Sequence, residues 1–325
     1  MAKVYLTIDT EYSSGLVSDL SAADRRDNFA RSIACLTPDG PTGLTHKLAL
    51  FEEHGIKAVF YVDPMPALVW GVAAIEDVVG PILDAGQDVQ LHCHTEWLEL
   101  AGDSSPLASK RTGRNLYDFP YEEQCEILAY ARDTLVAAGA PVPVAFRAGN
   151  YGADDDTLHA LRTIGVRYDS SHCPALADSA SRISLGPEDI DPMLYKGIVE
   201  VPVGSIAEIG GGQRHAQITA LTLAEMRAAI RHARDTGRPS FTLVSHSFEL
   251  VNRRTQAVNR IVRRRFEGLC RSLATMRGIT TADFRDSAPL PWNGQPTTEP
   301  LPASPLRTGY RYAEQLVSNT LYGAL

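Results

Sequence analysis

Short runs of apolar residues alternate along the chain with stretches in which apolar positions recur at helical spacing. The first run, Val4 to Ile8 (VYLTI), is β-branched and apolar and predicts a strand. Leu44 to His54 has helical periodicity and is followed by Gly55, a residue type that favours helix ends. The same patterns predict strands at 57–62, 88–91, 143–146, 166–168, 197–203, 241–244 and near 279, and helices at 75–83, 121–138, 154–164, 223–236 and 259–276. This alternation predicts an α/β protein with a parallel sheet, either open or closed into a barrel.

The domain organisation follows from the length of the chain and from the composition of its tail. At 325 residues and 44% hydrophobic content, the chain can bury a full core. We expect one domain over residues 1–286 and a tail over 287–325, whose first part, 287–306, is Pro-rich and typical of a linker. Residues 310–325 can add a terminal helix. The long polar segment 11–43 is expected to be a loop that acts as a lid or a substrate wall.

The stretch LHCHTEW (91–97) is the strongest candidate for a site. It follows an apolar run and holds His92, His94 and Glu96 at the expected carboxyl end of a strand, where α/β folds place their chemistry. If a helix begins directly after the strand, His92 and Glu96 face the same side, one turn apart, and His94 points elsewhere. The simpler interpretation is that one or two of these histidines only cap or pack.

Two carboxylates end the first strand. Asp9 and Glu11 are two residues apart, and such residues share a face when the segment is extended. Both can therefore serve one site, or one of them can be a loop cap.

Two further patterns have simple structural explanations. Gly210–Gly212 is not followed by the Lys-Ser or Lys-Thr of a phosphate-binding loop, so we interpret it as a flexible loop. The arginines from Arg253 to Arg265 are mostly at helical spacing and are explained by a solvated helix face, with contact to an anionic substrate as the minor alternative. The chain has no Gly-x-Ser-x-Gly motif, which weakens a serine hydrolase interpretation.

Charge, hydropathy and cysteine content narrow the function classes. The formal net charge of −8 argues against a nucleic-acid-binding protein and favours a small or neutral substrate. No apolar run approaches the roughly 18 residues of a membrane span, and Met1 leads into a strand without the apolar region of a signal peptide. The cysteines are odd in number and scattered, without CxxC spacing: Cys35, Cys93, Cys125, Cys173 and Cys270. We therefore expect reduced thiols in a cytoplasmic protein.

Five segments, taken in order, resemble the polysaccharide deacetylases, that is, the NodB-homology group or carbohydrate esterase family 4. These segments are TIDTE (7–11), LHCHTE (91–96), FRAGNYG (146–152), EVPVG (200–204) and LVSHSFEL (243–250). The resemblance spans roughly residues 3 to 286. It implies a deformed parallel (β/α) barrel of about seven units and a hydrolase that removes N-acetyl groups from amino sugars with a divalent metal.

The resemblance also implies roles for individual residues. Asp9 matches the general base, His92 the first metal histidine, Arg147 the arginine that orients the base, and His246 the general acid. The chain departs from the family pattern at two ligand positions. Thr10 stands where the family has its metal-binding Asp, and Glu96 stands where it has its second metal histidine.

These departures change the expected metal site. A divalent ion held by Glu11, His92 and Glu96 has about zero net charge with its ligands, against about plus one for one carboxylate and two histidines. It is therefore a weaker Lewis acid, and oxygen-rich ligation shifts preference from zinc toward harder ions such as manganese. Zinc, manganese and cobalt are the candidate metals, and His94 is the alternative nitrogen ligand.

The expected function is metal-dependent deacetylation of an N-acetylated saccharide. One alternative is hydrolysis of a non-sugar C–N bond by an enzyme of the same superfamily. The other is a catalytically inactive carbohydrate-binding protein that has lost the metal.

Overall fold

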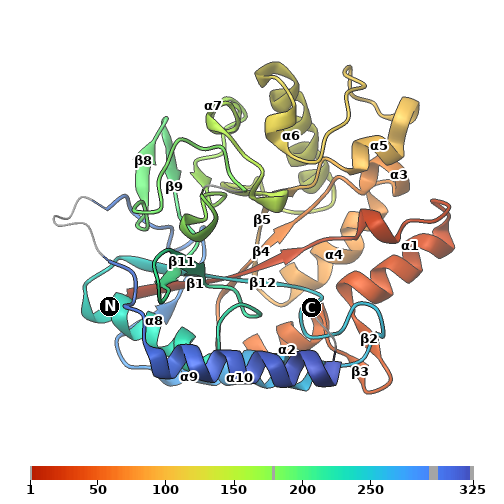
Figure 1. The fold of residues 1–325 in the computed structure, drawn as a ribbon. Coiled ribbons are helices and arrows are strands. Elements are labelled where there is room, and N and C mark those ends of the chain that lie inside the picture. Colours follow the sequence, from red (N-terminus) through yellow and green to blue (C-terminus); the bar gives the residue numbers. More distant parts are fainter. Residues whose placement is uncertain (1, 178–179, 293–298, 323–325) are drawn as a thin grey trace.

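A curled, mostly parallel sheet forms the centre of the molecule (Figure 1). The computed structural model describes residues 2–177, 180–292 and 299–322. Neighbouring strands in the sheet are, in order, β12 (Ser240–His246), β1 (Ala2–Thr10), β4 (Ala58–Val62), β5 (Asp88–Cys93), β6 (Ala145–Ala148), β7 (Tyr168–Asp169), β9 (Ile198–Glu200) and β8 (Met193–Tyr195). Only β8 on this path pairs in antiparallel fashion, and β13 (Ile279–Thr281) pairs in parallel with β1. The structure confirms the expected deformed parallel barrel.

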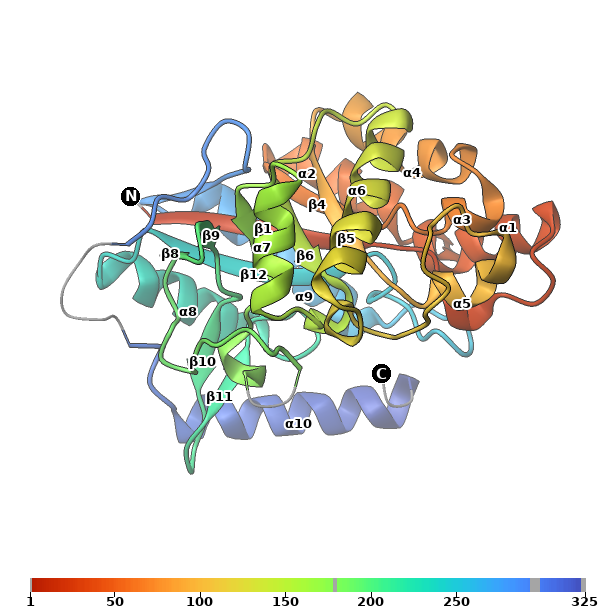
Figure 2. The same cartoon turned by 90° about the horizontal axis from the view of Figure 1, so that it is seen from above.

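Helices cover the outer side of the curled sheet (Figure 2). They are α2 (Leu44–His54), α3 (Ala67–Trp70), α4 (Ala73–Asp84), α5 (Trp97–Ala101), α6 (Tyr121–Ala137), α7 (Asp155–Thr163), α8 (Leu223–Asp235) and α9 (Arg260–Thr275). Capping explains several helix starts: the Asp154 carboxylate, for example, accepts a hydrogen bond from the Thr157 amide at 2.9 Å. Helix α2 ends at Gly55, whose φ of 61° is the left-handed conformation that the sequence predicts there.

Alternation along β1 separates the core from the site. Leu6 and Ile8 point outward and pack in the main hydrophobic core. Tyr5 points inward into a smaller cluster, where its ring lies 5.4 Å from that of Phe284 in the segment that follows β13. The inward-facing row continues with polar side chains toward the carboxyl end of β1. Asp9 therefore lies inside the barrel at the carboxyl ends of the strands.

The segment after β1 is more ordered than a loop. It contains the short 3-10 turn Ser14–Leu16, helix α1 (Ala22–Asn28), a π-helical turn at Phe29–Ile33 and a hairpin of β2 (Leu36–Thr37) and β3 (Gly40–Pro41). Local hydrogen bonds that hydropathy does not reveal explain the order. Ser21 caps α1 by accepting from the Asp24 amide, and the Asp24 carboxylate accepts from the amides of Ser18 and Leu20.

The triple glycine joins two short strands. Strands β10 (Ser205–Ala207) and β11 (Gln213–His215) form a hairpin, and Gly210–Gly212 lie in its turn with positive φ angles. This agrees with an ordinary loop rather than a phosphate-binding loop.

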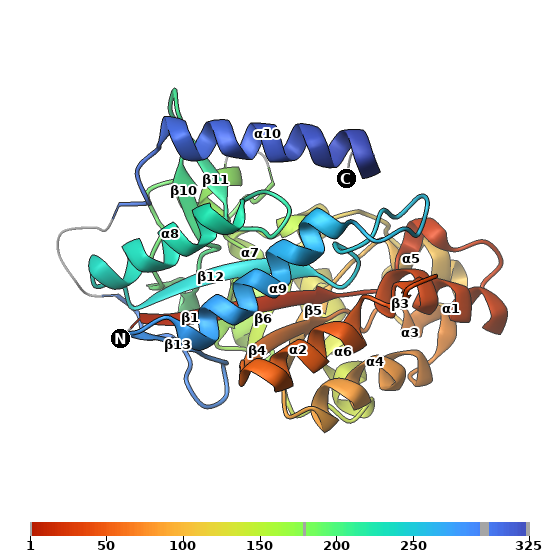
Figure 3. The same cartoon turned by 90° about the horizontal axis from the view of Figure 1, so that it is seen from below.

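The C-terminal tail returns to the domain through helix α10 (Pro305–Tyr322) (Figure 3). Arg311 forms an ion pair with Glu225 at 2.9 Å, and the Ser318 hydroxyl accepts from the Asn259 amide at 3.1 Å. The predicted terminal helix is therefore present from Pro305, although 293–298 and 323–325 lie outside the described residues. The boundary at residue 286 stays a prediction.

Candidate metal centre and catalytic site

His92 is held in a fixed tautomer by the neighbouring strand. It pairs in register with Arg147 across β5 and β6, and its Nδ1 lies 2.7 Å from the carbonyl oxygen of Arg147. A carbonyl can only accept, so Nδ1 donates to it, and Nε2 is the ring nitrogen left to contact Glu11 or a metal. His92 is buried, and its Nε2 faces the pocket 3.1 Å from Oε2 of Glu11.

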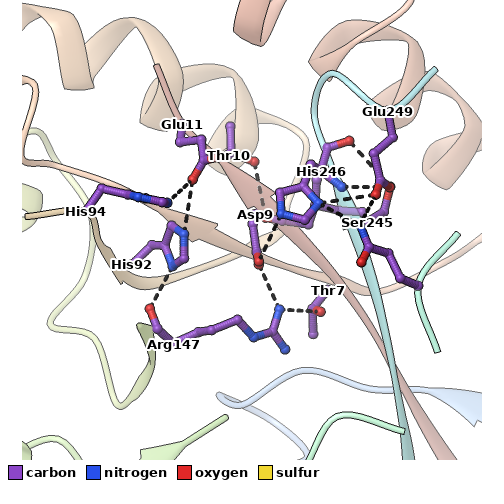
Figure 4. Close-up of polar contacts among 12 residues, drawn as sticks. Thr7, Asp9, Thr10, Glu11, His92, His94, Arg147, Ser245, His246 and Glu249 are labelled. Atoms are coloured by element: carbon purple, nitrogen blue, oxygen red, sulfur yellow. Dashed lines mark hydrogen bonds and ion pairs between the residues drawn. The ribbon is translucent and has the colours of Figure 1, made fainter. Parts of the chain in front are cut away.

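His94 faces the same point as His92, contrary to the prediction that it points elsewhere. Its Nε2 lies 2.6 Å from Oε2 of Glu11, and the two imidazole rings are 4.9 Å apart (Figure 4). The predicted alignment of His92 with Glu96 fails because the helix begins only at Trp97. Residues 94–96 form a turn, so helical spacing does not apply to them.

Glu11, His92 and His94 form a compact group of possible metal ligands. Their donor atoms all lie within 4.8 Å of one another. Burial raises the pKa of Glu11, but the two histidines outweigh it and hold the pKa well below its usual range. Burial has the opposite effect on His94 and lowers its pKa. The negative charge of Glu11 is the largest of the interactions that outweigh burial and raise the pKa of His94 well above its usual range. In the absence of a metal, the buried Glu11 carboxylate is therefore stabilised by its contacts with the two histidines.

Glu96 lies behind His94 rather than beside His92. Its Oε2 is 3.2 Å from Nδ1 of His94, and its Oε1 accepts from the side-chain amide of Asn150 at 3.1 Å. Since Glu11 contacts the other ring nitrogen, Glu96 can fix the orientation and tautomer of His94 without reaching the ligand group.

Gly149 allows the close approach of His94 to the turn after β6. A Cβ atom on this glycine would lie 2.7 Å from Nδ1 of His94 and 2.8 Å from the carbonyl oxygen of Cys93. The next two residues, Asn150 and Tyr151, have φ angles of 55° and 56°, a conformation that costs free energy for residues other than glycine. The turn is therefore shaped by its position at the site rather than by local preference.

Asp9 and Arg147 form a buried ion pair beside the ligand group. Nη1 of Arg147 lies 2.7 Å from Oδ1 of Asp9 and also donates to the Thr7 hydroxyl. The same guanidinium donates to the carbonyl and hydroxyl oxygens of Ser170 and stacks on the ring of Tyr61 at 4.4 Å. These contacts give the arginine one orientation, so it holds Asp9 in one position.

His246 completes the group at the end of β12. Its Nε2 lies 3.8 Å from Oδ2 of Asp9, and its Nδ1 lies 3.3 Å from Oε1 of Glu249. Burial lowers the pKa of His246, but Glu249 and Asp9 outweigh it and raise the pKa to about 9. Burial raises the pKa of Glu249, but the hydrogen bond and the positive charge of His246 outweigh burial and lower it to about 2. His246 is therefore protonated at neutral pH.

Two acidic residues of the site were missed by the sequence analysis. Glu249 lies in LVSHSFEL three residues after His246, a spacing that could have identified it on a turn. Asp63 directly follows β4, as a carboxylate follows β1, and its Oδ1 accepts from the amides of His94 and Met65. Burial raises the pKa of Asp63 to about 6. Thr10 lies outside the ligand group, because its hydroxyl donates to the carbonyl of Ile8 at 3.2 Å.

All of the candidate site residues except Glu96 and Arg147 line one pocket of about 250 Å³. Asp9 and Glu11 both line it, as their spacing predicts. The lining residues are Asp9, Glu11, His92, His94, Ala148, Asn150, Tyr151, His246, Phe248 and Arg253.

The arginines from Arg253 to Arg265 do not share a solvated helix face. Arg253 lies in a loop before α9, and Arg265 is buried against Glu314 of α10. The helical-face interpretation of these arginines is therefore wrong at both ends.

Comparison with known proteins adds one informative likeness. No protein-family profile matches the sequence, and no curated protein matches it. A solved structure of a Mycobacterium smegmatis protein assigned as a polysaccharide deacetylase matches 92% of this chain and 95% of its own, with a TM-score of 0.57 and 18% identity. The chain has the NodB-like polysaccharide deacetylase fold.

Other matches to the deacetylase fold are more distant. A family 4 carbohydrate esterase from Streptomyces lividans, solved with acetate, covers 89% of this chain and 97% of its own at a TM-score of 0.43 and 11% identity. A family 4 pseudoenzyme from Bacillus anthracis covers 88% and 65% at a TM-score of 0.46 and 10% identity. The fold assignment rests on the first match, and at 18% identity that match concerns the deacetylase fold alone.

Proposed function

We propose that this chain is a metal-dependent amide hydrolase that removes N-acetyl groups from an amino-sugar-containing saccharide. The observation that carries the proposal is the convergence of Glu11, His92 and His94 on one point, beside a carboxylate held by a buried arginine. Metal-assisted amide hydrolysis needs a set of metal ligands and a positioned general base in the same pocket.

The residues present fit a divalent metal. His92 and His94 each use Nδ1 for a hydrogen bond and direct Nε2 toward Glu11, the arrangement of histidine ligands in metal sites. This set takes the alternative ligand, His94, in place of Glu96, so the charge of metal plus ligands is about plus one rather than zero. Imidazole nitrogen suits zinc and its transition-series neighbours, so zinc, cobalt and manganese are the metals to test. When bound, such an ion supplies Lewis acidity and acidifies a bound water molecule.

Asp9 is the proposed general base. It lies in the same pocket as the ligand group and is held at 2.7 Å by Arg147, so one carboxylate oxygen stays fixed while the other remains available. Arg147 is the buried cation paired with this carboxylate, and the carboxylate is the group that takes a proton from water in the proposed step.

His246 is the proposed general acid. It is protonated at neutral pH because Glu249 and Asp9 raise its pKa to about 9, and its Nε2 faces the pocket near Asp9. A protonated imidazole in this position can donate to the departing amine nitrogen. Glu249 keeps Nδ1 oriented and stabilises the imidazolium.

The proposed substrate is a saccharide precursor met in the cytoplasm, such as a lipid-linked or nucleotide-linked amino sugar. All five cysteines are free in the structure, which agrees with a reducing compartment. In the described residues, no helix is both long and apolar enough to cross a membrane. Cell fractionation tests the location, and recovery from the periplasm or the medium would contradict it.

Metal analysis and acetate release test the activity together. Purified protein is loaded with zinc, cobalt or manganese and incubated with N-acetylglucosamine oligomers, and the released acetate is measured against an Asp9→Asn control. Bound metal with Asp9-dependent release supports the proposal. Bound metal without acetate release points to hydrolysis of another C–N bond, and no metal with no turnover points to a carbohydrate-binding protein.

A further inference from the structure

The candidate pocket has a cation at its rim that the proposed chemistry does not use. Arg253 lies in the loop between β12 and α9 and lines the pocket together with the ligand group. Its guanidinium stacks over the ring of Phe248 at 4.3 Å, and Nη2 donates to the Ser13 hydroxyl at 2.9 Å. An aromatic face and a hydroxyl thus hold an otherwise exposed side chain in one orientation.

The other charged side chains at the pocket each have a partner. Asp9 is paired with Arg147, His246 lies against Glu249, and Glu11 lies between the two histidines with which it would hold the proposed metal. Arg253 differs, because no carboxylate among the described residues forms an ion pair with it, and its polar contact is with a neutral hydroxyl. Of the charged side chains that line this pocket, Arg253 is the one left for a ligand of opposite charge.

Phe248 contacts both this cation and the proposed general acid, His246. Its ring lies 5.2 Å from the ring of His246 and 4.3 Å from the Arg253 guanidinium. Because His246 and Arg253 line the same pocket of about 250 Å³, one bound molecule can contact both.

We propose that Arg253 is a specificity residue that binds an anionic substituent, a carboxylate or a phosphate, on the acetamido sugar. The inference rests on the proposed function for the identity of the sugar, and on Arg253 itself for the charge. A guanidinium matches both anions through paired N–H donors. This assigns an anionic substrate to a chain whose net charge of −8 by itself favours a neutral one.

Binding measurements on the metal-loaded protein test the inference. Three ligands share the acetamido group: neutral N-acetylglucosamine, its 6-phosphate, and N-acetylmuramic acid, which carries a carboxylate. We expect calorimetry to give about 5- to 50-fold tighter binding for at least one anionic ligand, with the difference shrinking as salt rises. The preferred anion distinguishes phosphate from carboxylate.

Variants on the same loop supply the matched control. Arg253→Gln should abolish the preference for the anionic ligand over N-acetylglucosamine, while Arg253→Lys should retain part of it. Arg254→Gln removes the same charge from the next residue, which is exposed and does not line the pocket, and should have no effect. Equal affinity for neutral and anionic ligands in the wild type, or equal losses in the Arg253→Gln and Arg254→Gln variants, would overturn the inference.

Acetate release separates this inference from the proposed function. If an Arg253-dependent anion preference appears in binding but no acetate is released, the anion subsite stands and deacetylation falls. If acetate is released from neutral and anionic sugars at equal kcat/KM, deacetylation stands and the role of Arg253 falls.

Discussion

Nε2 of His94 lies 2.6 Å from Oε2 of Glu11, whereas Nδ1 of the same ring faces Glu96. The two carboxylates therefore contact opposite nitrogens of one imidazole and cannot have the same task. In the proposed metal site, Glu11 shares the ion with the histidine, and Glu96 orients the histidine ring.

Metal titration of two variants tests this division. His94→Ala should lose the metal together with activity, because it removes one of three donors. Glu96→Ala should keep the site and weaken metal affinity by about 10- to 100-fold, the usual cost of removing a residue that orients a ligand. The reverse order of losses would return Glu96 to the ligand set and remove His94 from it.

A pH profile tests the pairing of His246 with Glu249. Because the pKa of His246 is raised to about 9, kcat/KM should fall as pH rises through that value and the general acid loses its proton. Glu249→Gln removes the main favourable charge and should move this alkaline limb down by about 1 to 3 pH units. A limb that stays in place in the variant would exclude His246 as the titrating acid.

The same shift makes a stability prediction with a definite sign. A histidine whose pKa is raised on folding stabilises the folded state below its unfolded pKa, about 6.5. That contribution should be lost as pH rises through about 9, and Glu249→Gln should remove it. Urea unfolding midpoints of the wild type and of Glu249→Gln at pH 6 and pH 10 measure the effect. A difference in midpoint between wild type and variant that is the same at both pH values would contradict the prediction.

Replacing either partner of the Asp9–Arg147 pair should have different consequences. Arg147→Met leaves a buried carboxylate without its partner and should lower the free energy of unfolding by about 3 to 5 kcal/mol. Asp9→Asn keeps a hydrogen-bonding group of the same shape, so it should fold, bind metal and lose about 100- to 10,000-fold in turnover. Near wild-type turnover in Asp9→Asn would remove Asp9 from the chemistry.

Gly149 offers a steric test with a glycine control. Gly149→Ala places a methyl group against His94 and the Cys93 carbonyl, so metal affinity should fall although no ligand is changed. Gly80→Ala, in helix α4, meets no atom within 4 Å and should stabilise the fold by about 0.5 to 1 kcal/mol. Metal titration and urea unfolding of both variants give the comparison, and unchanged metal affinity in Gly149→Ala would show that the turn can move.

Strand periodicity predicted most of the fold and part of the site. The two-residue spacing of Asp9 and Glu11 predicts that both lie on one face of the strand end, and the structure shows that this face is the inner side of the barrel, because Leu6 and Ile8 pack in the outer core. Helix spacing failed at His94 and Glu96 because the turn before Trp97 depends on where α5 begins, and backbone hydrogen bonds set that start.

The remaining site residues depend on contacts between distant segments. Arg253 lies at the pocket because Phe248 and Ser13, 235 positions apart in the chain, both contact it. Such pairings leave no periodic signal in hydropathy. Asp63 differs, since a carboxylate directly after a buried strand is a signal that the sequence analysis used at Asp9 and overlooked here.

Arg147 contributes to the two halves of the site through different parts of the same residue. Its carbonyl oxygen sets the tautomer of His92, whereas its guanidinium holds Asp9. A substitution that changes only the Arg147 side chain can therefore misplace the proposed base, Asp9, while Glu11, His92 and His94 keep their positions. In evolution, a descendant of this chain could lose the proposed activity and still keep the ligand group intact, whereas an insertion or deletion that displaced β6 would disturb both halves at once.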